Sequence, residues 1–391
     1  MQKSHRISNI NKAGSGGWEV FLKARKMISE GIDVIELSIG EHDIPTDKSI
    51  LKAMHTSALA GNTGYAMVPG LLSLREAVAQ RVQARTGIST CVDNILITPG
   101  GQAGLFATHA ATCDNGDRAL YVEPFYATYP PTLRAQGLEA VSVPTRSRYG
   151  FQPRRADLED HAKGARSLLI NSPNNPSGSI YSKETLTMIA DVCKNHDLWL
   201  ISDEVYDTQI WSSKHISPRS LPGMQERTLV IGSMSKSHAM TGSRIGWVVG
   251  PQDMIAHLID FATNTTYGVA GFIQEAALFA LGQGVKFEEK IAAPFARRRK
   301  ITLNVLEDFP QVKAVDPQGG MYVMLDIRAT GISGIEFANR LLVQRHIAVM
   351  PGESFGQSAA GHLRVAMTIA DTAYEQALRT LCQYATDIAD T

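Results

Sequence analysis

The sequence is poor in cysteine and has no paired cysteine motif. Its four cysteines are Cys91, Cys113, Cys193 and Cys382, and no two of them form a CxxC pair. Structural zinc sites and disulfide frameworks need cysteines that are closely spaced or numerous, so the sequence favours neither. We therefore expect free thiols in a reducing compartment, and we predict no metal site.

The chain also lacks an excess of charge and a long apolar run. Its 38 lysine and arginine residues balance 38 aspartate and glutamate residues. Proteins that bind nucleic acids usually carry a basic excess, so we expect no nucleic-acid partner. No apolar run approaches the roughly 18 residues that cross a bilayer, and the N-terminus has no apolar signal-peptide region. We expect a cytoplasmic protein without a membrane partner.

The middle of the chain predicts an α/β fold. Short apolar runs alternate there with amphipathic stretches such as 183–196, whose apolar residues form one stripe. Runs without strict alternation are typical of parallel strands that are buried on both faces, so we predict a mainly parallel sheet covered by helices on both faces. The predicted strands are 95–98, 119–123, 140–144, 167–171, 198–203, 228–232 and 244–250.

The two ends of the chain predict a second, smaller α+β domain. A helix at 18–30 and a strand at 33–37 precede the large sheet, and further elements follow a break at 282–284. We assign residues 45–284 to a large cofactor-binding domain, and residues 1–44 and 285–391 to the small domain. The later elements are a helix at 287–309, which Pro294 either kinks or begins, strands at 321–326 and 347–350, and a helix at 371–388.

Lys236 stands in an unusual setting for a lysine. It directly follows an apolar strand, in Gly-Ser-Met-Ser-Lys. A lysine in a cleft loses hydration, which lowers its pKa and makes its amine a candidate nucleophile for a Schiff base. Most lysines are surface charges, but Ser233, Ser235 and Arg244 lie nearby, and hydroxyls with a guanidinium are typical of a phosphate site.

A glycine pair offers a second phosphate site. Gly100 and Gly101 follow the strand 95–98, and the pair and Gln102 open the next predicted helix. Glycines let a phosphate approach the backbone, and a helix N-terminus supplies free N–H groups. The alternative is an ordinary turn. The pattern is neither GxGxxG nor a Walker A loop, so it gives no support to a nucleotide-dependent enzyme.

Two polar groups follow neighbouring predicted strands. Asp203 closes the strand 198–203, where a carboxylate is costly unless it meets a cation. Asn175 lies in the rigid turn 171–178, which has two prolines and a glycine. The alternatives are a helix cap for Asp203 and a connecting turn for Asn175.

Together these residues fit a single cofactor. The two candidate phosphate sites suit a phosphate group, and Asp203 suits a protonated ring nitrogen. Asn175 and Tyr206 suit a phenolate oxygen, and Lys236 suits an aldehyde. Pyridoxal phosphate carries all four groups, and a lysine Schiff base with an acidic partner for the ring nitrogen is its usual protein setting.

The same motifs resemble a known family. The chain carries NSPNNPSG at 171–178, SDEVY at 202–206 and SMSKSHAMTGSRIGW at 233–247. From about residue 39 to 366 it is similar to the fold-type I pyridoxal-phosphate aminotransferases of class I/II, the aspartate aminotransferase superfamily. The resemblance implies that Lys236, Asp203 and Tyr206 are catalytic, that Asn175 and Tyr206 bind the ring oxygen, and that Tyr126 stacks on the ring. The phosphate contacts that it implies are Gly101, Gln102, Ser233, Ser235 and Arg244.

The resemblance also implies substrate contacts and a partner subunit. Gly40 matches a glycine whose backbone faces the substrate carboxylate, and Arg364 matches the arginine that holds the α-carboxylate. Asn175 is expected to contact the substrate as well as the cofactor. Tyr65 resembles a tyrosine that reaches the phosphate in the neighbouring subunit, which implies a homodimer with shared active sites. His42, Ser243 and Gln102 depart from common family residues, and the departure leaves a preference for acidic substrates open.

The predicted activity is the transfer of an α-amino group between an amino acid and a 2-oxo acid, by ping-pong kinetics through Lys236. A lyase on the same scaffold, performing β-elimination or forming a cyclopropane, is the nearest alternative. A regulator's effector module is a more distant one. We expect Gly16, Gly17, Trp18 and Tyr322 on the distal side of the pocket, although Trp18 also suits a core position. Phe125 and Tyr129 are compatible with core packing alone.

Overall fold

The large sheet has the predicted α/β architecture. The computed structural model describes residues 1–11 and 18–390. Seven strands form a sheet of order β2-β8-β7-β6-β5-β3-β4, in which only β8 runs antiparallel to its neighbours. The strands are β2 (Ile95–Thr98), β3 (Arg118–Val122), β4 (Glu139–Val143), β5 (Ala165–Asn171), β6 (Trp199–Asp203), β7 (Thr228–Ser233) and β8 (Gly246–Val249).

Helices cover both faces of this sheet because its strands place apolar side chains on both. In β5, Leu168 and Ile170 pack with α7 and α8 on one face, whereas Leu169 packs with α5 and α6 on the other. The helices of this part are α3 (Lys48–Leu59), α4 (Leu72–Thr86), α5 (Gly101–Thr112), α6 (Tyr129–Ala135), α7 (Arg155–Ala162), α8 (Lys183–Asn195), α9 (Met234–Ser237), α10 (Gln252–Thr263) and α11 (Gly271–Gly282).

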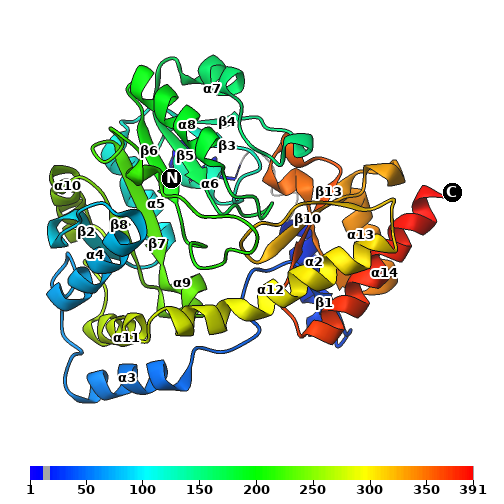
Figure 1. Ribbon diagram of the computed structural model, residues 1–391, viewed down its shortest axis with the longest axis horizontal. Helices are drawn as coiled ribbons and strands as arrows, with labels where there is room; N and C mark the ends of the chain where they lie inside the picture. Colours follow the sequence, from blue (N-terminus) through cyan, green and yellow to red (C-terminus); the bar gives the residue numbers. More distant parts are fainter. Residues whose placement is uncertain (12–17, 391) are drawn as a thin grey trace.

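Both ends of the chain build a smaller unit beside the large sheet (Figure 1). Near the N-terminus, β1 (Ile35–Glu36) pairs in parallel with β11 (Ile347–Ala348), so the N-terminal segment joins the small unit as predicted. A four-stranded antiparallel sheet has the order β12-β13-β10-β9. The other elements are α1 (His5–Ser8), α2 (Trp18–Ser29), β9 (Lys313–Val315), β10 (Tyr322–Asp326), α13 (Gly334–Arg345), β12 (Met350–Pro351), β13 (His362–Ala366) and α14 (Asp371–Ala389).

The long helix α12 (Val285–Glu307) runs from beside α9 to beside α14 (Figure 1). It begins well before Pro294 and contains that proline in its interior, so the prediction that Pro294 begins the helix is wrong. The predicted break before it is confirmed, since α11 ends at Gly282. The domain boundaries at residues 44 and 284 stay a prediction. Within residues 1–11 and 18–390, no helix is long and apolar enough to cross a membrane.

Arg298 of α12 joins distant segments of the chain. Its guanidinium, only 3% exposed, bonds both carboxylate oxygens of Asp43, at 2.6 and 3.0 Å, and an oxygen of Asp371 at 2.9 Å. It also donates to the backbone carbonyl of Met367 at 2.9 Å. The segment after Gly40 is thereby tied to α12 and to the start of α14.

We expect Arg298→Met to lower the free energy of unfolding by about 2 kcal/mol, because it leaves two partly buried carboxylates without their shared cation. Chemical denaturation measures this loss. The matched control is Arg297→Met, since Arg297 also pairs with Asp371 but is 57% exposed, and its loss should stay below about 1 kcal/mol. Equal losses for the two variants would contradict the bridging role of Arg298.

Candidate active site

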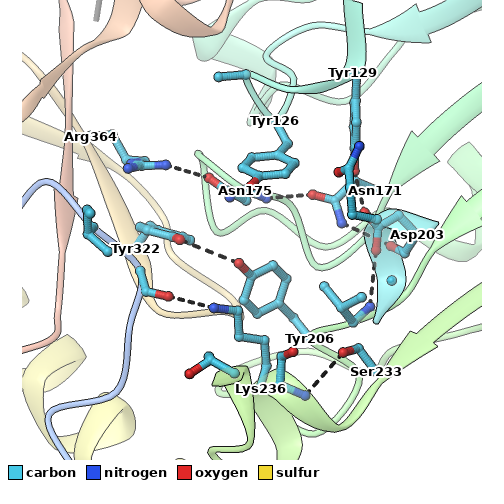
Figure 2. A pocket seen from close by; sticks show the side chains of 18 of the residues that line it. Tyr126, Tyr129, Asn171, Asn175, Asp203, Tyr206, Ser233, Lys236, Tyr322 and Arg364 are labelled. Carbon is cyan, nitrogen blue, oxygen red and sulfur yellow. Dashed lines mark hydrogen bonds between the residues drawn. The ribbon is translucent and has the colours of Figure 1, made fainter. Parts of the chain in front are cut away.

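A cavity of about 260 Å³ lies at the carboxyl ends of the central strands, where a parallel sheet usually binds its ligands (Figure 2). Side chains from the large sheet and from the small unit both line it. Apart from Tyr65, the predicted cofactor, catalytic and substrate-carboxylate contacts are all among them: Gly40, Gly101, Gln102, Tyr126, Asn175, Asp203, Tyr206, Ser233, Ser235, Lys236, Arg244 and Arg364.

Lys236 projects into this cavity from α9, directly after β7. Its amine Nζ donates a hydrogen bond to the carbonyl oxygen of Gly40 at 2.5 Å. Burial lowers the pKa of Lys236, and the nearby Arg364 and Arg244 act in the same direction, while Tyr322 and Glu41 oppose them. A lowered pKa increases the neutral fraction of the amine, which is the nucleophilic and basic form.

Position 40 requires a glycine because the Tyr322 side chain approaches it closely. A Cβ atom at position 40 would lie 1.6 Å from the Tyr322 hydroxyl oxygen. The Tyr322 hydroxyl accepts a hydrogen bond from the Tyr206 hydroxyl at 3.5 Å. Burial raises the pKa of Tyr206 well above its ordinary value, so this phenol stays protonated and can donate a hydrogen bond.

Asp203 is a buried carboxylate at the end of β6. The Tyr129 hydroxyl donates to its Oδ2 at 2.5 Å, and the backbone N–H of Val205 donates to Oδ1 at 3.3 Å. Burial raises the pKa of Asp203 to about 6, although both hydrogen bonds act to lower it. A charged Asp203 is therefore costly on its own and suited to a cationic partner.

Tyr129 is a functional residue that the sequence interpretation missed. Its ring packs in the core between α5, α6 and the sheet, as the interpretation allowed. Its hydroxyl, however, bonds the one carboxylate among the described residues that line the cavity. No sequence pattern predicts this contact, because a tyrosine in a run of aromatic residues is equally compatible with packing alone.

Arg364 faces the cavity from β13 in the small unit. Its Nη1 donates to Asn175 Oδ1 at 3.0 Å, and its Nη2 bonds the carbonyl oxygen of Ser38. The guanidinium carbon lies 4.4 Å from the ring centre of Tyr322 and 4.7 Å from that of Phe355. Its buried Nε has no hydrogen-bond partner in the described part of the chain. The arginine is thus held rigidly with a donor to spare.

The glycine turn and Arg244 form a cradle at the other end of the cavity. Gly100 has φ +78°, and a Cβ there would lie 2.6 Å from Arg244 Nη2. Arg244 itself is left-handed, with φ 49°, and donates to the Thr241 carbonyl at 3.0 Å. The strand predicted at 244–250 therefore begins only at Gly246, because this backbone conformation turns Arg244 toward the N-terminus of α5.

The side-chain amide of Gln102 is occupied within the large unit. Its Nε2 donates to Thr132 Oγ1 at 2.7 Å, and its Oε1 accepts from Thr128 Oγ1 at 3.1 Å. What Gln102 can offer an anion in the cavity is its backbone N–H in the first turn of α5.

The predictions for Trp18 and Tyr322, for Gly16 and Gly17, and for Tyr65 have three different outcomes. Trp18 and Tyr322 line the cavity, and Trp18 is 38% exposed at the start of α2, so its interpretation as a core residue is wrong. Gly16 and Gly17 lie outside the described residues. Tyr65 lies outside the cavity, 93% exposed, with its ring against that of Tyr267.

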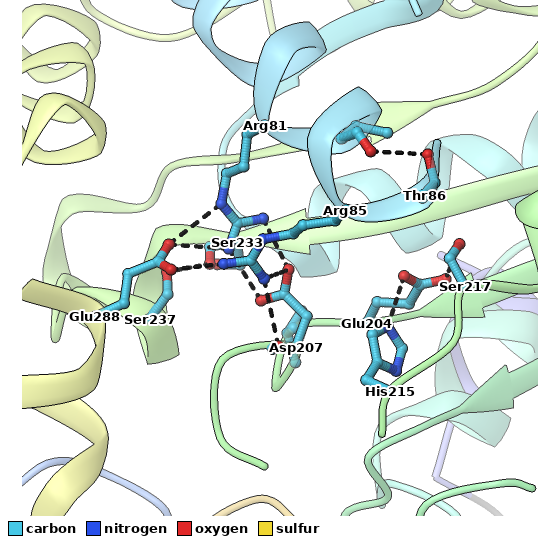
Figure 3. A network of polar contacts seen from close by, with 12 residues as sticks. Arg81, Arg85, Thr86, Glu204, Asp207, His215, Ser217, Ser233, Ser237 and Glu288 are labelled. Carbon is cyan, nitrogen blue, oxygen red and sulfur yellow. Dashed lines mark hydrogen bonds and ion pairs between the residues drawn. The ribbon is translucent and has the colours of Figure 1, made fainter. Parts of the chain in front are cut away.

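A charged network supports the loop behind the cavity (Figure 3). Arg81 pairs with Asp207 at 2.7 Å and with Glu288 at 3.1 Å, and Arg85 pairs with the same two carboxylates. Burial acts to raise the pKa of Asp207, but Arg81 and Arg85 hold it below its ordinary value. The network fixes the residue after Tyr206 to α4 and α12.

Comparison with known proteins decides the family. The family model described as aminotransferase class I and II matches residues 32–381. The chain belongs to this family. It is 38% identical to an arginine–pyruvate transaminase of Pseudomonas aeruginosa, over 99% of each chain. It is 32% identical to a probable aspartate/prephenate aminotransferase of Thermus aquaticus, over 97% of this chain and 98% of that one.

Solved structures agree with this assignment. The aspartate aminotransferase of Thermus thermophilus with maleate superposes with a TM-score of 0.90 at 31% identity, covering 99% of this chain and 100% of that one. The predicted aminotransferase activity is confirmed, and the names of these relatives give no support to the lyase alternative. The family is generally dependent on pyridoxal phosphate, and its members act on amino acids and oxo acids.

The raised pKa of Asp203 predicts how the stability of the cofactor-free protein depends on pH. Because its folded pKa of about 6 exceeds the ordinary 3.8, this group should reduce the free energy of unfolding as pH rises from about 4 to 6. The shift of about two pKa units corresponds to about 3 kcal/mol.

We therefore expect Asp203→Asn to stabilise the cofactor-free protein above pH 6, by up to about 3 kcal/mol, and to have little effect near pH 4. Denaturation curves at pH 4, 6 and 8 test this expectation. Asp160→Asn, on the exposed face of α7, is the control and should show no such trend. An Asp203→Asn protein no more stable than the wild type at pH 8 would contradict it.

Proposed function

We propose that this aminotransferase binds pyridoxal phosphate in the cavity and moves an α-amino group between an amino acid and a 2-oxo acid. The observation that carries the proposal is the convergence of the Lys236 amine, the Asp203 carboxylate and the Arg364 guanidinium on one cavity (Figure 2). This reaction needs an amine, a carboxylate that pairs with a cationic ring nitrogen, and a guanidinium that binds the substrate carboxylate.

The residues present fit the cofactor. The buried Asp203 suits a protonated ring nitrogen, because burial raises the pKa of this carboxyl and a cation beside it would favour its charged form. Gly100, Gly101 and Arg244 form a cradle that suits a phosphate at the N-terminus of α5, and a Cβ at Gly100 would collide with the Arg244 guanidinium. Ser233 and Ser235 line the same cavity and add hydroxyls. When bound, the cofactor supplies an aldehyde that carries the amino group and a ring that withdraws electrons.

Five further roles in this proposal belong to residues that line the cavity. Asn175 and Tyr206 hold the ring oxygen, and Tyr126 stacks on the ring. Lys236 removes the proton from the substrate α-carbon and returns it at the aldehyde carbon, which its lowered pKa permits. Asp203 keeps the ring nitrogen protonated.

The substrate carboxylate is held between the two units. Arg364 binds this carboxylate through its guanidinium. The guanidinium is oriented by hydrogen bonds to Ser38 and Asn175 and by contacts with two aromatic rings. Gly40 presents its backbone to the same carboxylate. One substrate leaves as an oxo acid before the next arrives, so we expect ping-pong kinetics.

We further propose a homodimer in which Tyr65 serves the neighbouring subunit. Tyr65 and Tyr267 form an exposed aromatic pair, and Met67 and Leu72 nearby are also exposed apolar residues. Apolar residues gathered on a surface are typical of a subunit contact. The cytoplasmic location stays a prediction, which cell fractionation tests.

Lys236→Ala should lower transamination by at least about a thousandfold, because no other described residue that lines the cavity carries an amine to replace the base and the attachment point. Borohydride reduction of the wild-type protein should fix the cofactor on the peptide that contains Lys236, and mass spectrometry should find none on the variant. Lys52→Ala, on the exposed side of α3, is the control. Transamination at the normal rate by Lys236→Ala would overturn the proposed function.

Mixed dimers test the role of Tyr65. If Tyr65 acts across the interface, a Lys236→Ala subunit paired with a Tyr65→Ala subunit contains one intact site. Random mixing of the Lys236→Ala and Tyr65→Ala proteins should then give about a quarter of the wild-type activity, in addition to whatever activity Tyr65→Ala dimers retain. Mixing that restores nothing, with mixed dimers detected by mass spectrometry, would contradict a shared site.

A further inference from the structure

The cavity has an apolar wall that the transfer reaction itself does not use. Phe21, Ala127, Met350 and Phe355 pack in one hydrophobic cluster and all line the cavity. Trp18 extends this wall, with its ring centre 5.6 Å from that of Phe21 in an edge-on contact. The wall therefore combines α2, the loop after β3 and the segment around β12.

This apolar wall is fixed next to the carboxylate-binding arginine. Phe355 lies against the guanidinium of Arg364, and its carbonyl accepts from the Phe125 N–H at 3.1 Å. The buried Glu123 carboxylate accepts from the Ser358 N–H at 2.8 Å, and a Cβ at Gly356 would lie 2.6 Å from the carboxylate carbon of Glu123. A side chain on the α-carbon of a carboxylate bound at Arg364 therefore starts beside a rigid apolar surface.

The charged groups of the cavity are already committed. Among the described residues that line it, the charged ones are Lys236, Arg244, Arg364 and Asp203. In the proposed function, Lys236 binds the aldehyde and Arg244 binds the phosphate. Arg364 binds the α-carboxylate, and Asp203 binds the ring nitrogen. The Gln102 amide is bound to Thr128 and Thr132. Among the described residues that line the cavity, none has an uncommitted charge to pair with a charged substrate side chain, and burying that charge against the apolar wall is costly.

We propose that the amino acid substrate of this enzyme has an uncharged, apolar side chain, which packs against Phe21, Met350 and Phe355. The inference rests on the proposed function and adds the substrate class to it. It separates this chain from its relatives that are named for the charged amino acids arginine and aspartate.

A panel of amino acids with the cofactor-loaded enzyme tests the inference. Single-turnover conversion of the bound cofactor is followed by absorbance with phenylalanine, leucine, methionine, alanine, aspartate, glutamate and arginine. We expect kcat/KM at least tenfold higher for phenylalanine, leucine and methionine than for aspartate, glutamate or arginine. Faster conversion by a charged amino acid overturns this inference alone. Conversion by none of them overturns the proposed function and the inference with it.

Binding without turnover provides a second measurement. Calorimetry with the same enzyme compares three carboxylates that lack an amino group: 3-phenylpropanoate, succinate and 5-guanidinopentanoate. We expect 3-phenylpropanoate to bind at least tenfold more tightly than the other two. Tighter binding of either charged analogue overturns the inference.

A variant of the wall separates a specific contact from a general defect. Phe21→Ala should lower kcat/KM for phenylalanine about tenfold, mainly by raising KM, and leave the value for alanine within about twofold. Tyr149→Ala, which removes an exposed aromatic ring outside the cavity, should change neither value. An equal loss for phenylalanine and alanine in Phe21→Ala overturns the packing role.

Discussion

The site depends on one buried carboxylate at the end of β6. Asp203 has its Oδ2 bonded by Tyr129 at 2.5 Å, yet burial still raises its pKa to about 6. A fold that keeps a carboxylate there loses stability unless a cation is bound, so the group is best explained by a ligand. The network of Arg81, Arg85 and Glu288 holds Asp207, and with it the chain that follows Asp203 and Tyr206.

The small unit completes the site from the opposite side. Gly40 meets the Lys236 amine through its carbonyl, and Arg364 reaches Asn175 across the cavity. These segments are also anchored at a point outside the cavity, because Arg298 ties Asp43 to the start of α14. The same unit brings Phe355 against Arg364, so that one rigid surface both binds a carboxylate and offers an apolar wall.

The sequence predicted what has a local signature. The strands of the large sheet were found because residues buried on both faces form continuous apolar runs, and Lys236, Asp203 and Asn175 because polar groups follow such runs. Tyr129 and Phe355 were missed because aromatic residues that face a cavity read like core residues. Arg244 was placed in a strand because a left-handed φ leaves no mark on a non-glycine sequence. The contacts that Tyr129, Phe355 and Arg244 make join chain segments that are far apart in sequence, so no local sequence pattern predicts them.

A crystal structure of the protein grown with pyridoxal phosphate tests this arrangement most directly. We expect continuous density from the Lys236 amine to the cofactor, the ring nitrogen within hydrogen-bond distance of Asp203, and the phosphate between Gly101 and Arg244. A cofactor bound elsewhere, or one in this cavity with its ring nitrogen turned away from Asp203, would contradict the account.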